Sequence, residues 1–316
     1  MQDRATANPP AAQHLAALRW LLLSPHFLQP TPAARVGVFE WSTGELAGVE
    51  LWLQRQAAQP ETLLQWMAAR PTKRLGHYAE HLLEFYLTHS SLHTLQAAHL
   101  QLRGETGATL GEIDFLLTDS YGHRLHWELA VKFFLCMSTS STVAPSDFLG
   151  PNNVETLAHK WHKVFEKQLT HAPPSPWNDF TWRPQAFTRG WMFYRWGYPV
   201  PSCSALNSAH CKGFWTPHSE IADLPAARYV HLSRLQWLAP VASIGMLGGY
   251  GDGGREGDGE SNCEGGAQLL SRAEMAQALD RYWTDSGRRD AQMVAQLSDG
   301  EFPREVQRFF IRHNES

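Results

Sequence analysis

Two acidic residues and a lysine stand in a predicted β-hairpin. Its first arm, LGEIDFLL, contains Asp114, and its second arm, RLHWELAVKFFL, contains Glu128 and Lys132. If the hairpin turns near Tyr121, Asp114 lies directly opposite Glu128, with the two Cβ atoms roughly 5 Å apart. Two facing carboxylates repel each other unless a cation lies between them. Lys132 and a divalent metal ion are the two candidates, so the hairpin predicts a site.

The second arm has the pattern of a strand that is buried on both faces. One face is apolar throughout and consists of Leu125, Trp127, Leu129, Val131, Phe133 and Leu135. The other face sets Ala130 and Phe134 beside the charged residues, and such a nearly unbroken apolar run is typical of a central strand. Charges inside a central strand cost free energy unless they are used. The alternative interpretation is a half-buried hairpin that exposes Glu128 and Lys132 as an ordinary surface pair.

The elements around the hairpin predict a mixed α/β core. A helix is predicted in TKRLGHYAEHLLEFYLTHS, and a short strand follows at Leu95–Leu102. A second helix, packed over the sheet, is predicted at Asn153–Leu169, with Asn152 and Glu155 as its N-terminal capping pair. A further strand is predicted at Arg189–Gly197. The order is therefore helix, three-stranded antiparallel meander, helix, strand.

Segments on both sides extend this predicted core of residues 71–200. Residues 1–70 are predicted to be a helical extension, and residues 201–316 a mixed extension packed on the core. The Gly-, Asp- and Glu-rich tract 248–266 has almost no side chain to bury and predicts a flexible loop. The other predicted elements are helices at Ala11–Leu23, at Glu45–Ala69 with a break at Pro60, and from Ser271, and extended segments within Tyr229–Val241 and Glu301–Arg312.

At this point the chain resembles the PD-(D/E)XK superfamily of restriction-endonuclease-like nucleases. In that superfamily the second strand supplies an Asp, the third supplies (Asp/Glu)-x-Lys, and the first helix often adds a Glu. Asp114 within GEID matches the strand Asp, Lys132 matches the Lys, and Glu80 matches the helix Glu. The chain departs from the pattern at Ala130, where an acid is expected. Glu128 lies two residues earlier, on the same face of the same strand.

The resemblance implies a restriction-endonuclease-like fold and metal-dependent hydrolysis of phosphodiester bonds in nucleic acid, with DNA the expected substrate. The implied ligands of Mg²⁺ or Mn²⁺ are Asp114, Glu128 and Glu80. Lys132 would orient or deprotonate the attacking water, or neutralise charge in the transition state. The implied phosphate contacts on the following helix are Lys160, Lys163 and Gln168. A solvated helix face is the alternative interpretation of these lysines.

The wider pattern is also similar to an uncharacterised bacterial family of unknown function, family 1853. The matching segments lie between about residues 74 and 240 and are RLGHYAEHLLEFYL, LGEIDFLL, HWELAVKFFL, LGPNNVETLAHKWHKVFEKQL, HCKGFW and LQWLAP. This resemblance implies the nuclease-like fold and supplies no substrate.

Two other functions remain open from the sequence. Ala130 and the acidic charge balance are compatible with a nuclease-fold module that binds nucleic acid or protein without cutting. His77, Glu80 and His81 fit the HxxEH signature of inverted zinc metalloproteases, in which the two histidines share a helix face and the glutamate acts as general base. That signature requires a distant third ligand, such as Glu155, which nothing in the sequence marks.

Composition sets wider limits on the function. The 316 residues carry a formal net charge of −4, so nucleic-acid binding would need a local basic patch. No apolar run reaches the roughly eighteen residues of a transmembrane helix, and no signal peptide is evident. The four cysteines follow no CxxC spacing, which disfavours a disulfide framework and a zinc ribbon. We therefore expect a cytoplasmic protein without a membrane partner, whose oligomeric state the sequence leaves open.

Overall fold

The computed structural model describes residues 10–29, 37–104, 106–242 and 268–314, which form the mixed α/β fold predicted from the sequence. The α-helices are α1 (Ala11–Leu23), α2 (Thr43–Ala58), α3 (Glu61–Ala68), α4 (Leu75–His89), α5 (Leu157–His162) and α6 (Arg272–Ser286). A π-helical turn at Lys163–Lys167 and a 3₁₀ turn at Gln168–Thr170 continue α5. Further 3₁₀ turns lie at Pro145–Asp147, His218–Asp223 and Arg234–Trp237.

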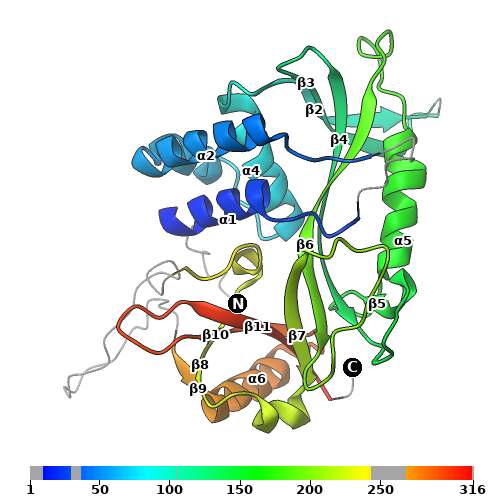
Figure 1. Cartoon of the computed structure of the whole chain (residues 1–316). Coiled ribbons are helices and arrows are strands. Elements are labelled where there is room, and N and C mark those ends of the chain that lie inside the picture. The colour runs from blue at the N-terminus through cyan, green and yellow to red at the C-terminus, as the bar shows by residue number, and fades with distance from the viewer. Residues whose placement is uncertain (1–9, 30–36, 105, 243–267, 315–316) are drawn as a thin grey trace.

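Within the described part of the chain, eleven strands form one sheet (Figure 1). Along its main path the order is β2 (His93–Arg103), β3 (Thr109–Asp119), β4 (Arg124–Cys136), β6 (Arg183–Arg195), β7 (Cys211–Pro217), β11 (Glu305–Arg312), β10 (Gln292–Leu297), β8 (Arg228–His231) and β9 (Leu270–Ser271). The two short strands off this path are β1 (Gly37–Val38) beside β6 and β5 (Phe148–Leu149) beside β4.

Strand direction changes along the sheet. The first three strands form the antiparallel meander predicted from the sequence, and β6 then lies parallel to β4. The next neighbours, β7 and β11, continue the parallel run, and β10, β8 and β9 are antiparallel again. Both flanking segments therefore contribute strands to the sheet itself: β1 comes from residues 1–70, and β7 to β11 come from residues 201–316.

Helices cover both faces of this sheet. Figure 1 shows α1, α2 and α4 on one side of β4 and β6, and α5 on the other side. The largest apolar cluster joins the first group of helices to the alternate residues Leu125, Trp127, Phe133 and Leu135 of β4. On the opposite face, Ala130 packs with Val164 and Leu169 of the segment that follows α5. Strand β4 is thus a central strand covered on both sides, as its apolar run predicted.

Most helix predictions are confirmed, and one helix start is wrong. The N-terminal helices, the break at Pro60 and the Ser271 capping box appear as expected. The helix predicted from Asn153 instead begins at Leu157, because Thr156 is its N-cap and accepts a hydrogen bond from the His159 amide. Asn153 has a φ of 59°, a left-handed conformation outside the helical range. The glycine-rich tract 248–266 lies outside the described residues.

Strands β7 and β10 were not predicted, although each is a fully integrated neighbour in the sheet. None of the described helices is both long and apolar enough to cross a membrane.

Candidate functional site

The candidate site is a fork between β3 and β4. The ladder between these strands runs from Thr118↔Arg124 to Phe115↔Trp127 and goes no further. At the next position, Asp114 faces Glu128, as the predicted hairpin register requires. The Asp114 amide donates to Glu128 Oε1 at 3.3 Å, and the Leu129 amide donates to Asp114 Oδ2 at 2.8 Å. The two carboxylates therefore accept hydrogen bonds from backbone groups that the separating strands leave free.

The electrostatics of the fork disfavour two negative charges. Glu128 is only 1 % exposed, and this burial raises its pKa to about 8, against the Asp114 amide hydrogen bond and the attraction of Lys160. Burial and the neighbouring Glu128 charge raise the pKa of Asp114 well above its usual value, while the hydrogen bond from Leu129 opposes that shift. At neutral pH the pair is stabilised by a shared proton or by a cation.

Glu80 lies on α4 and belongs to the same electrostatic environment. It is half-buried, and burial raises its pKa, which the charges of His77 and His99 offset in part. Its own charge raises the pKa of both Asp114 and Glu128. In the described ranges, however, no three His, Cys, Asp or Glu side chains converge closely enough to hold a metal ion without rearrangement. The three implied metal ligands are therefore neighbours and not a closed ligand set.

The lysines divide into two roles that the sequence did not separate. Lys132 donates to Glu155 Oε2 at 2.9 Å, and the two side chains are 31 % and 30 % exposed. Lys160 is half-buried, and its charge lowers the pKa of Glu128. Burial, with the repulsion of Lys132 next in size, lowers the pKa of Lys160 itself to about 8. Lys160 is thus the lysine whose charge acts on the fork, while Lys132 is held by Glu155.

Two polar residues hold Glu128 in place. Gln168 Nε2 donates to Glu128 Oε2 at 2.8 Å, and His126 Nε2 lies 3.1 Å from Glu128 Oε1. Gln168, predicted to contact phosphate, therefore contacts the carboxylate. Its Oε1 atom is buried without a hydrogen-bond partner among the residues that the structure describes. His126 was not predicted as a site residue, although its position two residues before Glu128 on the same strand face was a usable signal.

An open groove lies beside the fork, on the side of Gln168. Its volume is about 590 Å³, and it lies between the start of β3 and the π-helical turn after α5. Its basic lining residues are Lys163, Lys167 and His171. Gln168 lines the groove and also donates a hydrogen bond to Glu128, so this side chain connects the groove to the carboxylate pair. Lys163, the third predicted phosphate contact, is exposed on this lining.

The motif for an inverted zinc protease does not form a ligand set within the described residues. His77 is exposed at the start of α4, whereas His81, one turn later, is half-buried. Glu155, the distant ligand that this interpretation would require, is instead paired with Lys132.

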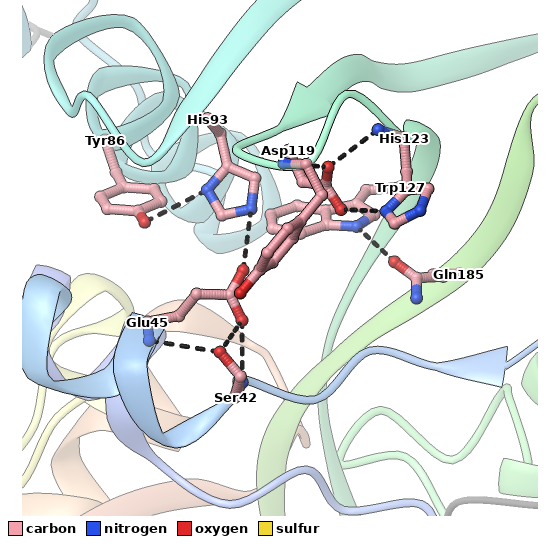
Figure 2. Close-up of polar contacts among 9 residues, drawn as sticks. Ser42, Glu45, Tyr86, His93, Asp119, His123, Trp127 and Gln185 are labelled. Atoms are coloured by element: carbon pink, nitrogen blue, oxygen red, sulfur yellow. Dashed lines mark hydrogen bonds and ion pairs between the residues drawn. The ribbon is translucent and has the colours of Figure 1, made fainter.

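A second polar cluster lies near the other end of the hairpin (Figure 2). Asp119 accepts hydrogen bonds from the His123 ring and from the amides of Tyr121 and His123. In the same view Trp127 donates to Gln185, and Ser42 and Glu45 form the capping box of α2. Asp119, an acid of the same hairpin, is thus matched by local donors, whereas Glu45 belongs to α2 and also lies 3.9 Å from His93 of β2.

A family model described as Domain of unknown function (DUF1853) matches residues 16–311. The chain belongs to the DUF1853 family. The match confirms the resemblance to family 1853 and extends it beyond residues 74–240. No curated protein and no solved structure matches the chain. Membership in DUF1853 assigns no activity, so the function has to be argued from the fork.

Proposed function

We propose that this protein is a metal-dependent nuclease of the PD-(D/E)XK type, which hydrolyses phosphodiester bonds in nucleic acid. One observation carries the proposal: the carboxylates of Asp114 and Glu128 face each other at a fork in a mixed sheet, and the surroundings raise the pKa of both. The element order supports it, because α4, the meander β2–β3–β4, α5 and the parallel strand β6 follow the order of the resembled core.

The donor set suits a hard divalent cation. Carboxylate oxygens are the ligands that Mg²⁺ and Mn²⁺ accept, and Mg²⁺ commonly keeps several waters and uses one or two carboxylates. Asp114 and Glu128 would supply the protein ligands, with Glu80 as the third donor. Such an ion, when bound, lowers the pKa of a water and stabilises negative charge on the scissile phosphate.

The remaining side chains have roles consistent with hydrolysis. A water oxygen forms a bond to phosphorus, the bond from phosphorus to the leaving alcohol oxygen breaks, and the water proton passes to a base. Lys160, whose pKa is lowered to about 8, is the nearby group that can accept this proton, and Lys132, paired with Glu155, can offset charge. Gln168 and His126 orient Glu128. Lys163 and Lys167 in the groove can contact the flanking phosphates.

A nuclease-fold module that binds without cutting is the second candidate. Two observations favour it: the three acids do not form a closed ligand set in the described chain, and Ala130 replaces the expected acid. Such a module would bind nucleic acid with a strong salt dependence through the groove lysines.

Purified full-length protein with labelled single- and double-stranded DNA and RNA separates these functions. We expect cleavage in Mg²⁺ or Mn²⁺, loss of cleavage with a chelator or in Asp114→Asn, and retention in His77→Ala. Salt-sensitive binding that survives Asp114→Asn, without cleavage in any metal, would favour the binding module. Activity that requires His77 and not Asp114 would overturn the nuclease assignment.

A further inference from the structure

His99 of β2 has a strained backbone beside the fork. The ladder pairs Ala98 with Phe115 and Leu100 with Ile113, so His99 is the residue opposite Asp114. Its φ is 54°, in the left-handed region that only a few per cent of non-glycine residues adopt. Such a conformation costs free energy and persists only where surrounding contacts hold it. The contacts of this side chain are therefore the place to look for its role.

The imidazole of His99 bridges two carboxylates from different elements. Nδ1 lies 3.2 Å from Glu112 Oε1 on β3, and Nε2 lies 3.6 Å from Glu84 Oε2 on α4. A ring nitrogen that faces a carboxylate must carry a proton to be attracted to it, so this geometry favours the doubly protonated imidazolium. The Glu84 carboxylate raises the pKa of His99 to about 9, against the effect of burial.

This bridge joins the two elements, α4 and β3, that carry the implied metal ligands Glu80 and Asp114. Glu84 lies four residues after Glu80 on α4, so the two carboxylates share a helix face. Glu112 lies two residues before Asp114 on β3, so an ion pair to it ties the helix to that strand next to the fork. The charge of His99 also acts directly on Glu80, where it lowers the pKa. The bridge therefore fixes α4 against β3 and offsets the repulsion among the neighbouring acids.

We propose that His99 is a positioning residue, a cationic clamp that keeps Glu80 near Asp114 and Glu128, so that all three acids can reach a shared divalent cation. This role rests on the proposed metal-dependent function. The three acids do not form a closed ligand set in the described residues, so an ion has to draw them together. The clamp limits how far α4, which carries Glu80, can separate from β3. The strained backbone is the local cost of placing the ring between the two elements.

Mn²⁺ titration calorimetry on the full chain tests the clamp, with His99→Gly as the decisive variant. Glycine relieves the left-handed strain and removes the cation, so we expect an unchanged or higher Tm but a roughly tenfold weaker Mn²⁺ affinity, the lower end of the loss seen when a supporting residue of a metal site is removed. Glu84→Gln should weaken Mn²⁺ binding similarly. The double variant should be little worse than either single one, because both remove the same bridge.

Two variants complete the test. His99→Arg, which restores a cation with several donors, should recover part of the affinity. His123→Ala, which removes the His123–Asp119 pair at the turn of the hairpin, should leave Mn²⁺ binding unchanged. Equal Mn²⁺ affinity in wild type and His99→Gly would overturn the clamp alone. A wild-type protein that binds no Mn²⁺ would overturn the proposed metal-dependent function, and the clamp with it.

Discussion

Asp114 and Asp119 lie five residues apart on the same strand, and their surroundings are opposite. Asp119 is partly buried, which raises its pKa, but the hydrogen bonds from His123 and from two amides outweigh burial and lower the pKa below its usual value. Asp114 is also partly exposed, but desolvation and the facing Glu128 charge raise its pKa. Groups within the protein stabilise the charged form of Asp119. The charged form of Asp114 is disfavoured, and an added cation would stabilise it.

The same contrast holds for the groups around each acid. Around Asp119 the donors come from neighbouring residues, the amide of Tyr121 and the ring and amide of His123 (Figure 2). Glu45 in the same view pairs locally with Ser42 and also lies 3.9 Å from His93 of β2. The groups around the fork come from distant elements, as with Gln168. Local pairing is typical of a turn or a helix cap, while convergence from distant elements is typical of a site.

The largest expected effect is a difference in nuclease activity between variants of the two aspartates. Asp114→Asn should lower nuclease activity roughly 100-fold or more, the usual cost of removing a positioned catalytic group, because it removes a cation-binding charge without changing volume. Asp119→Asn should leave activity within about twofold, since Asp119 lies outside the fork. Initial cleavage rates in saturating Mn²⁺ measure both, and equal losses in the two variants would remove the distinction between them.

The next effect concerns position 130. Ala130 is 2 % exposed and packs with Val164, Leu169 and Ala186, so the acid expected by the resembled pattern would be buried among apolar side chains. Ala130→Glu should destabilise the fold by about 3 kcal/mol or more and should not increase cleavage. Urea unfolding measures the loss. A stable, more active variant would show that position 130 opens to the fork after all.

A smaller effect follows from the pKa of Glu128. Its folded-state pKa of about 8 lies above the ordinary glutamate value of 4.5, so the unfolded chain binds fewer protons between these pH values. This contribution to stability is therefore present below about pH 4.5 and is lost as the pH rises toward 8. The stability of Glu128→Gln relative to wild type should rise across that window, on the order of 1–3 kcal/mol.

Mn²⁺ provides the control for this pH dependence. An ion bound at the fork favours the charged carboxylate, so it should reduce the loss of stability in wild type and have little effect in Glu128→Gln. Thermal unfolding at pH 5, 6.5 and 8, with and without Mn²⁺, provides the comparison. Parallel pH profiles for the two proteins would contradict the raised pKa of Glu128.

The smallest effect is structural. Asp119→Asn keeps an acceptor for the two amides but loses the charged partner of His123, so we expect a loss of about 1 kcal/mol in the free energy of unfolding. Chemical denaturation at pH 7 measures it. A loss as large as that of Ala130→Glu would mean that the whole hairpin, and not only its turn, depends on the Asp119 charge.

The sequence determined the local parts of this protein. The period-two pattern of β4, the turn near Tyr121 and the caps at Ser42 and Ser271 are encoded within a few residues, so their positions could be predicted. The opposition of Asp114 and Glu128 followed from the same local register. Nothing local marked β7 and β10, because their place in the sheet depends on pairing with strands far away in the chain.

Only the tertiary structure decided how the fork is completed. The π-helical turn brings Gln168 to Glu128, Glu155 takes Lys132 away from the expected role, and α4 and β3 together hold His99 in a left-handed conformation. Each of these depends on contacts between elements more than ten residues apart, where packing fixes the partner and the backbone strain. A single sequence shows residue types and local periods, but it does not show which distant side chain will reach a given carboxylate.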